Sequence, residues 1–323
     1  MYYIGIDLGG TTIGGALADE SGTLLETKLI PTNMPRPAEA ICADIASLCI
    51  SICSSAGISF DEVGAVGVGS PGVIHDGIVE RATHLQFENV PLAGILEGML
   101  HKKIYLLNDG NAAAYGEFVA GAGKGLTSLL MLTIGTGIGG GMIIDGKIYS
   151  GFNGASAEMG HLVIDASGRP CRCGKRGCFE RYCSAGALID DTKTAMRENP
   201  ESLMWELCGG DLDAVDGHTP FDAAEKGDPA AANVVDNFMK YLSIGVSNLV
   251  SLMQPQVLCI GGGISARGDA ITIPLNRYVT AQSYIHDADR RTKILAGKLA
   301  NLAGVIGAAM YAKEELLAID RQL

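Results

Sequence analysis

The chain has 323 residues, of which 47% are hydrophobic and 19% are charged, and its net charge is −12 with a pI near 4.9. This composition is typical of a globular protein rather than a disordered one, and the length favours two domains over a single core. An acidic balance argues against a nucleic-acid partner, because phosphate backbones require clustered Lys and Arg, and no apolar stretch reaches the roughly 18 residues of a membrane span.

The N-terminal part is predicted to be a β-meander that leads into alternating helices and strands. Apolar runs at residues 2–7, 13–18 and 23–30, separated by turn residues, predict three strands. Apolar side chains at helical spacing predict a helix at residues 37–56. The elements predicted next are a strand at 63–68, a helix at 90–100, a strand at 104–107 and a helix at 111–119.

The opening pattern returns at residue 128. A strand at 128–134, a glycine-rich stretch at 135–141 and short strands at 142–144 and 147–149 repeat the N-terminal order. We interpret this as an internal duplication, with chance as the alternative because strand–glycine–strand patterns are common. The later elements are predicted as helices at 185–197, 230–253 and 302–317 and a strand at 257–260.

Residues 158–181 form a loop-like segment with one histidine, three cysteines and two glutamates. The predicted ligands of one zinc ion are His161, Cys171, Cys173 and Cys178. Structural zinc sites take four soft nitrogen and sulfur ligands, although this spacing is not that of a zinc finger and ordinary buried thiols are the alternative. Glu158 and Glu180 flank the cluster and are expected to face a polar substrate.

The remaining cysteines lie mostly in apolar surroundings and are interpreted as small buried side chains. They are Cys42, Cys49, Cys53, Cys183, Cys208 and Cys259. Free thiols, together with the lack of a visible secretory signal, predict a cytoplasmic protein.

Two glycine-rich hairpins have the chemistry of phosphate-binding turns, with ordinary tight hairpins as the alternative. The residues of the first hairpin are Asp7, Gly9, Gly10, Thr11 and Thr12, and those of the second are Thr133, Gly135, Thr136 and Gly137. Glycines let the backbone approach an anion, hydroxyls donate hydrogen bonds and the aspartate can hold a metal ion. The G-x-G-x-G of the second hairpin is not followed by a helix, which disfavours a dinucleotide fingerprint.

Two other stretches follow predicted strands. Asn108 and Asp109 precede a helix at a strand's carboxyl end, where α/β folds place working residues. Asp109 could accept a proton from an attacking hydroxyl, or it could simply cap the helix. Gly261, Gly262 and Gly263 leave room for a nucleoside against the backbone, with a plain turn as the alternative.

These motifs resemble those of the ROK family of sugar kinases over nearly the whole chain. The matching stretches are DLGGTT at 7–12, GSPG at 69–72, NDGNAAAYGE at 108–117, IGTGIGGG at 134–141, EMGH at 158–161, CRCGKRGCFE at 171–180, IGGGIS at 260–265 and NLAGVIGAA at 301–309. The resemblance implies an α/β, actin-like/RNase H-like duplicated two-domain fold with ATP and sugar in the interdomain cleft. We expect a small domain at 1–115, joined by the C-terminal helix at about 300–323, and a large domain at 116–299 that carries the zinc-binding insertion.

The resemblance also implies a function: transfer of a phosphoryl group from ATP to a hexose, with glucokinase as the specific expectation. Asp109 is then the catalytic base and Asp7 positions Mg²⁺ on ATP. The implied sugar ligands are Asn108, Glu158, His161 and Glu180, with Gly69 and Ser70 nearby. The zinc is implied to be structural, with one imidazole nitrogen of His161 on the metal and the other on the sugar.

Two residues depart from the family pattern. His84 stands where an asparagine usually contacts the sugar, and Ala157 stands where glycine is common. His84 is therefore a candidate sugar-binding residue, with a solvated loop residue as the alternative, and another hexose (allose, fructose, mannose or N-acetylmannosamine) stays open as the substrate. A sugar-sensing regulator is a further alternative, but no helix-turn-helix precedes the first hairpin, so DNA binding is not expected. A dimer or tetramer is implied by the family.

Overall fold

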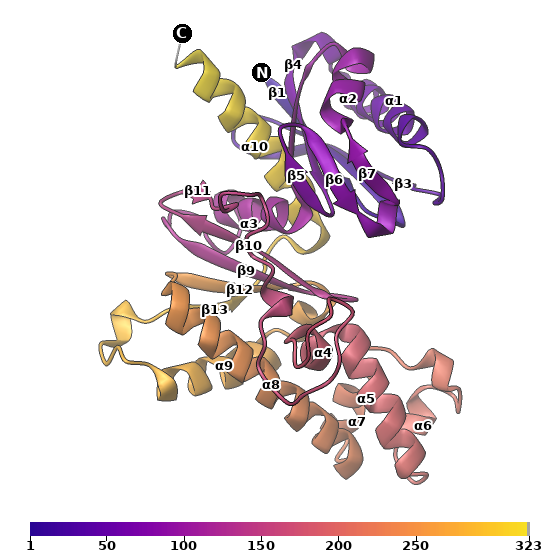
Figure 1. The fold of residues 1–323 in the computed structure, drawn as a ribbon, viewed down its shortest axis with the longest axis vertical. Coiled ribbons are helices and arrows are strands. Elements are labelled where there is room, and N and C mark those ends of the chain that lie inside the picture. Colours follow the sequence, from indigo (N-terminus) through magenta and orange to yellow (C-terminus); the bar gives the residue numbers. More distant parts are fainter. Residues whose placement is uncertain (322–323) are drawn as a thin grey trace. The chain divides into compact units, whose positions relative to one another are not determined.

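The computed structural model describes residues 1–321, with Asp320 described by its backbone alone, and Figure 1 shows their elements. The chain forms two compact units. The first contains Met1–Met131, Gly140–Ala157 and the chain from Lys298 onward, and the second contains Leu132–Gly139 and Glu158–Gly297. The predicted domain limits at residues 115 and 299, and the predicted cleft between the domains, stay predictions. Residues 322 and 323 of the predicted C-terminal segment lie outside the described residues.

The first unit is built on a five-stranded sheet of order β3-β2-β1-β4-β8. Its strands are β1 (Tyr2–Leu8), β2 (Thr12–Ala18), β3 (Leu24–Pro31), β4 (Val63–Ser70) and β8 (Lys103–Asn108). The first three form the predicted meander, and β1, β4 and β8 run parallel. The register pairs Asp7 with Gly69 and Ser70 with Asn108, which brings four predicted site residues to one edge of the sheet.

Helices cover both faces of this sheet (Figure 1). On one face, α1 (Ala38–Ala56) and α2 (Leu92–Leu100) contribute buried side chains to a core shared with β1, β2 and β4. On the other face, α10 (Ala303–Asp320) packs on α3 (Asp109–Ala120) and on the sheet. A β-carbon at Gly5 or Gly67 would overlap the backbone of Val305 or Ala308, so glycine is required for α10 to approach the strands.

Helix α1 is the one helix of residues 1–321 whose length and hydropathy would allow it to cross a membrane. Its buried face, which includes Ile45 and Ile52, belongs to the core of the first unit. Asp44, on the same helix, forms an ion pair with Arg36 at 2.6 Å. These contacts are those of a core helix, and the absence of a membrane span stays a prediction.

A second five-stranded sheet has the order β11-β10-β9-β12-β13. Its strands are β9 (Leu129–Ile134), β10 (Ile138–Ile144), β11 (Lys147–Ile148), β12 (Val257–Gly261) and β13 (Lys293–Ala296). The order repeats that of the first sheet strand for strand, as the predicted duplication requires, and the mixed α/β fold class is confirmed. Strand β10 begins at Ile138 rather than at residue 142, because the glycines at 139–141 pair as strand despite lacking apolar side chains.

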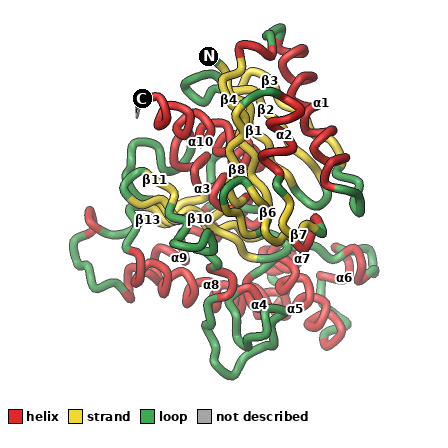
Figure 2. Tube along the Cα trace, turned by 45° about the horizontal axis from the view of Figure 1, so that its top comes forward, coloured by secondary structure: helices red, strands yellow, loops and turns green. Residues whose placement is uncertain are grey.

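The second unit is mainly helical around its part of this sheet (Figure 2). Its helices are α4 (Glu180–Cys183), α5 (Ala185–Glu198), α6 (Met204–Leu207), α7 (Thr219–Glu225), α8 (Pro229–Met253) and α9 (Asp269–Gln282). Helices α5 and α8 match the predicted helices. The elements that the sequence did not indicate are α6, α7, α9, β13 and, in the first unit, a small sheet of β5 (Val73–His75), β6 (Ile78–Ala82) and β7 (Phe87–Val90).

Candidate functional site

The carboxyl ends of β1, β4 and β8 carry the predicted catalytic groups of the first unit. Asp7 is half-buried, and its removal from water, with a smaller contribution from the nearby charge of Asp109, raises the pKa of Asp7 to about 6. A β-carbon at Gly304, in the first turn of α10, would lie 3.0 Å from Asp7 Oδ2. The amino end of α10 therefore lies beside this carboxylate, where a helix favours negative charge. The family-like stretch at 301–309 contains Gly304, but no sequence pattern assigned this glycine a role, since its role depends on tertiary packing.

Asn108, rather than Asp109, is the N-cap of α3. Asn108 Oδ1 accepts hydrogen bonds from the backbone N–H groups of Gly110 and Asn111 at 2.9 and 3.3 Å, and its Nδ2 donates to the carbonyl of Gly72 at 3.1 Å. Asp109, the first helical residue, is exposed and accepts one bond from Gly110 N–H at 2.8 Å. Capping, the alternative role considered for Asp109, is thus performed by its neighbour. Partial removal of the Asp109 carboxylate from water raises its pKa.

The first glycine hairpin lies beside these carboxylates. Gly9 N–H donates to the carbonyl of Thr12 at 2.9 Å, and the Thr32 hydroxyl donates to the carbonyl of Gly9 at 2.7 Å, so the turn is closed by backbone bonds. The side chains of Thr11 and Thr12 are exposed, as a phosphate-binding role requires.

His84 lies against this hairpin. A β-carbon at Gly10 would come 3.1 Å from the Cβ atom of His84. A positive charge on His84 opposes the burial that raises the pKa of Asp109, which places the imidazole within electrostatic reach of that carboxylate. His84 is exposed, and both the sugar-binding role and the alternative of a solvated loop residue stay predictions.

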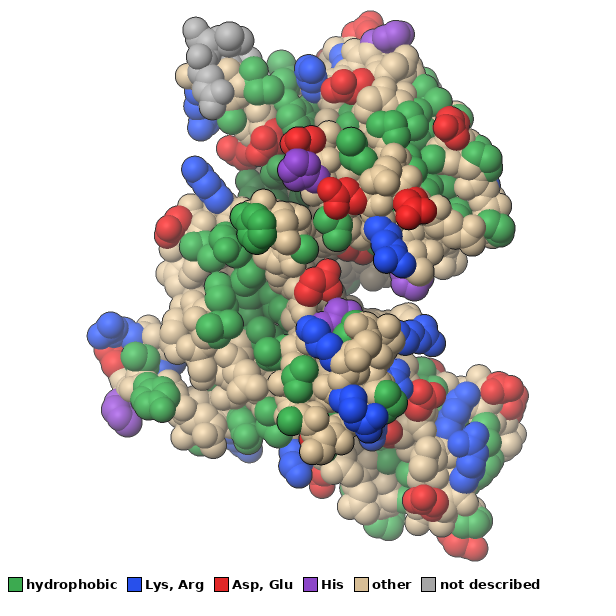
Figure 3. Space-filling model, viewed as in Figure 1, with side chains coloured by type: hydrophobic (Ala, Val, Ile, Leu, Met, Phe, Trp, Pro, Cys, Tyr) green, Lys and Arg blue, Asp and Glu red, His purple; other side chains and the backbone are tan. Residues whose placement is uncertain are grey.

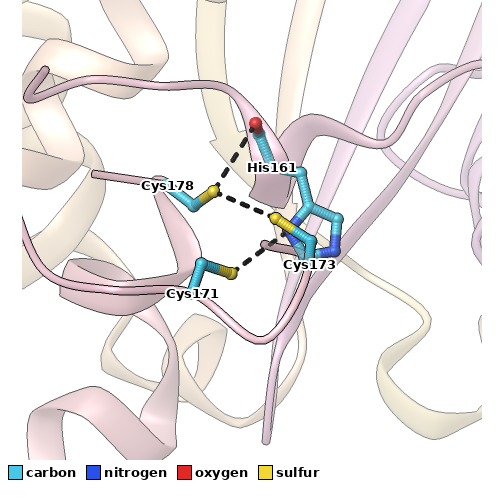
Figure 4. Close-up of side chains that lie close together, drawn as sticks. All are labelled: His161, Cys171, Cys173 and Cys178. Atoms are coloured by element: carbon cyan, nitrogen blue, oxygen red, sulfur yellow. Dashed lines mark hydrogen bonds between the residues drawn. The ribbon is translucent and has the colours of Figure 1, made fainter. Parts of the chain in front are cut away.

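In the second unit, the four predicted zinc ligands come together (Figure 4). Their ligand atoms all lie within 4.8 Å of one another, with Cys171 Sγ 3.7 Å from His161 Nδ1 and Cys173 Sγ 3.5 Å from Cys178 Sγ. Tetrahedral zinc with these ligands has edges of roughly 3.5–3.8 Å. Donor chemistry and spacing both fit zinc, and Nδ1 is the imidazole nitrogen that faces the thiols.

The cysteines outside this cluster are buried, as predicted. Burial raises the pKa of Cys42 to about 12 and also raises those of Cys49, Cys53 and Cys183. These thiols stay protonated at neutral pH, which suits apolar packing rather than reactivity.

The two glutamates beside the cluster differ in their surroundings. Glu180, the first residue of α4, accepts a hydrogen bond on Oε2 from Ile138 N–H at 3.0 Å, so it lies against the second glycine hairpin. Glu158 is exposed, and its carbonyl accepts a bond from His161 N–H at 3.1 Å. Ala157, just before it, has a φ of 64°, a left-handed conformation that favours glycine.

A cavity of about 180 Å³ opens beside the second hairpin. Gly135, Thr136 and Gly263, three predicted nucleotide-binding residues, lie in its wall. Its apolar wall is formed by Ile134, Ala185, Leu188, Phe238 and Ile264, and its polar groups come from His218 and Arg267. The cavity is smaller than the roughly 300–1,000 Å³ that holds a drug-sized ligand, so it suits one ring rather than a whole nucleotide.

The other predicted nucleotide-binding residues of this unit lie outside the cavity wall. Gly137 contacts Glu180, Thr133 Oγ1 lies beside Gly139, and Gly262, with a φ of 79°, packs on the carbonyl of Ile134. Arg267 and His218, which the sequence did not single out, come from segments about 50 residues apart, so no spacing rule could have connected them.

Comparison with known proteins identifies the family. The sequence profile of the ROK family matches residues 3–315. The chain belongs to the ROK family. It is 35% identical over 317 residues to a glucokinase of Thermotoga maritima (97% of this chain, 98% of the relative) and 34% identical over 317 residues to a glucokinase of Halalkalibacterium halodurans (97% and 96%).

Solved structures agree with this placement. A ROK family glucokinase from Streptomyces griseus, in complex with glucose and AMPPNP, is 33% identical and covers 97% of this chain and 100% of its own, with a TM-score of 0.81. The ROK membership and the actin-like fold class expected from the motifs are therefore confirmed.

Proposed function

We propose that this ROK protein is an ATP-dependent hexose kinase, specifically a glucokinase that phosphorylates the 6-hydroxyl of glucose. The observation that carries the proposal is that two adjacent residues at the end of β8 have different roles. Asn108 caps α3, so Asp109 can keep its carboxylate for a substrate. The similarity to glucokinases over nearly the full chain supports the same reading.

In the proposed reaction, the sugar hydroxyl attacks the γ-phosphorus of ATP, the bond to ADP breaks and the hydroxyl proton passes to Asp109. The raised pKa of Asp109 suits this role, because a general base works best when its pKa approaches the ambient pH. Backbone amides and hydroxyls of the hairpin at Gly9–Thr12 would hold phosphate oxygens. Mg²⁺, held by Asp7, would supply neutralisation of the phosphate charge.

The remaining assignments belong to the same proposal. The sugar hydroxyls are bound by Asn108, Glu158, His161 and Glu180, with Gly69, Ser70 and His84 nearby. Zinc on the cysteine cluster would be structural: Nδ1 of His161 would hold it together with the three thiols, and Nε2 would stay available for the sugar. The nucleoside lies along Gly261–Gly263, with its ring in the cavity beside Thr136.

A coupled assay of ADP release over glucose, mannose, fructose, allose and N-acetylmannosamine tests the activity. We expect turnover with glucose, and Asp109→Asn should lower kcat by about 10²–10⁴-fold while sugar binding persists. Asp76→Asn, on an exposed turn, is the matched control and should leave kcat unchanged. No turnover with any of these sugars would refute the kinase assignment.

Zinc is tested separately, by elemental analysis. We expect about one zinc per chain, lost in Cys173→Ser. Fully active protein without metal would refute the structural zinc site.

A non-catalytic sugar sensor is the second candidate. The observation in its favour is 27% identity to a xylose repressor of Bacillus spizizenii, over 98% of this chain and 78% of the repressor. A sensor would bind a sugar in calorimetry without releasing ADP, and the same assays therefore separate the two functions.

We also propose a cytoplasmic homo-oligomer, a dimer or tetramer, without nucleic-acid or membrane partners. The net charge of −12 supports the lack of a nucleic-acid partner, and Figure 3 shows acidic and basic side chains interspersed on one face. Sedimentation velocity would test it: a single monomeric species at micromolar concentration would contradict the proposal.

A further inference from the structure

Beside the zinc cluster, the hydroxyl of Tyr182 joins two residues of the loop to helix α4. It accepts a hydrogen bond from Arg169 N–H at 2.9 Å and donates one to Asp165 Oδ2 at 3.1 Å. Tyr182 is only 4% exposed, so water competes little for these bonds. Neither Tyr182 nor Arg169 nor Asp165 is one of the zinc ligands.

The backbone of Arg169 extends this connection toward the thiols. Its carbonyl accepts a hydrogen bond from Gly177 N–H at 2.8 Å, and Gly177 immediately precedes Cys178. Arg169 itself stands two residues before Cys171. Asp165 stands four residues after His161, and its N–H donates to the carbonyl of Gly177 at 3.4 Å. One hydroxyl thus bonds two residues, Arg169 and Asp165, whose backbones both pair with Gly177, the residue before Cys178.

The guanidinium of Arg169 attaches the same loop to the helices behind it. Its Nη1 donates to the carbonyl of Arg181 at 3.0 Å and to Asp191 Oδ2, on α5, at 3.0 Å. It lies 4.8 Å from the ring centre of Tyr182, which in turn lies 4.2 Å from the ring of Tyr241 on α8. The half-exposed ion pair with Asp191 contributes little by itself, so the buried hydroxyl of Tyr182 is the stronger part of the network.

We propose that Tyr182, Arg169 and Asp165 form a clasp that holds the zinc ligands in their binding arrangement before the metal arrives. The clasp rests on the zinc site of the proposed function and adds positioning residues to it. A loop ordered in advance loses less conformational entropy when it binds zinc, so affinity rises. Groups that orient metal ligands typically change metal affinity by about 10–100-fold. Through the zinc, the clasp also positions His161 for the sugar.

Tyr182→Phe tests the clasp, because it removes the hydroxyl and keeps the stacked ring. In purified full-length protein, competition with a zinc chelator should show affinity about 10-fold weaker than in the wild type. Tyr241→Phe is the matched control, since it makes the same change on the stacked ring and should keep wild-type affinity. The KM for glucose should rise in Tyr182→Phe and return toward the wild-type value with excess zinc, while the KM for ATP stays constant. A general loss of stability would instead lower kcat, by reducing the folded fraction, and would leave the KM for glucose unchanged.

Asp165→Ala provides a second variant if Tyr182→Phe fails to fold. Because both changes remove the bond between the Tyr182 hydroxyl and Asp165, the loss of zinc affinity in the double variant should be smaller than the sum of the two single losses. Wild-type zinc affinity in Tyr182→Phe, with zinc absent from Cys173→Ser, would overturn the clasp and leave the zinc site intact. Wild-type protein that never binds zinc would overturn the zinc site and the clasp with it.

Discussion

Asp7→Asn should stabilise the protein at neutral pH while it removes activity. The pKa of Asp7 rises from 3.8 to about 6 on folding, chiefly because burial takes the carboxylate out of water. Each pKa unit corresponds to about 1.36 kcal/mol, so the ionised group costs the fold about 3 kcal/mol above pH 6. The stability associated with the protonated form is fully present below pH 3.8 and is lost as pH rises through 6.

The measurement is the free energy of unfolding in urea for both proteins at pH 4.0 and pH 7.5, on either side of the pI near 4.9. Any fixed difference between an amide and a protonated carboxyl cancels when the two pH values are compared. The advantage of Asp7→Asn should therefore be larger at pH 7.5 than at pH 4.0 by about 2 kcal/mol. An advantage that does not change with pH would show that folding does not raise the pKa of Asp7.

Such a cost is expected at a working site. A carboxylate that is unfavourable without a partner favours the binding of a cation, so Mg²⁺ with ATP should lower the pKa of Asp7 and recover part of the lost stability. Added Mg²⁺ and ATP should accordingly raise the melting temperature of the wild type more than that of Asp7→Asn. Equal rises in melting temperature in the two proteins would show that Asp7 does not hold the cation.

Three further substitutions test the roles of His84, Ala157 and Gly67. His84→Asn should raise the pKa of Asp109 by removing a nearby positive charge, so the acid limb of the kcat/KM profile should move to higher pH. An acid limb at the wild-type pH would show that His84 does not influence Asp109. Ala157→Gly should raise the free energy of unfolding by roughly 0.5–1 kcal/mol, because it relieves a φ of 64°, and a loss of stability in urea would contradict this. Gly67→Ala should lower the free energy of unfolding by about 3 kcal/mol, since its β-carbon would overlap the backbone of Ala308 on α10. Gly94→Ala is the control, because its β-carbon would enter open space and should not destabilise the protein. Equal losses of melting temperature in the two variants would contradict this prediction.

Local sequence patterns predicted the structure correctly where a residue type has one main structural use. Apolar runs ended by glycine and aspartate located β1 and β8, and the repeated pattern located the second sheet. The Cys/His cluster could be predicted because three cysteines and a histidine within eighteen residues have few other uses, although zinc as its metal stays a proposal. Their ligand atoms lie within 4.8 Å of one another in the structure.

Other features depend on packing that no local pattern encodes. Asn and Asp are equally good helix caps, so the sequence could not decide whether Asn108 or Asp109 caps α3. Strand β10 was placed four residues late because glycines carry no side-chain alternation. The cavity wall combines Leu188, His218 and Arg267 from three separate segments, which only the folded chain brings together.

The two departures from the family pattern have different physical meanings. Ala157 occupies a left-handed conformation, so its consequence is local backbone strain beside Glu158. His84, by contrast, adds a titratable group next to Gly10 and within reach of Asp109. An asparagine at this position carries no charge that could lower the pKa of Asp109, whereas a charged histidine does lower it. If Asp109 is the base proposed above, the substitution at residue 84 therefore bears on the pKa of that base as well as on the choice of sugar.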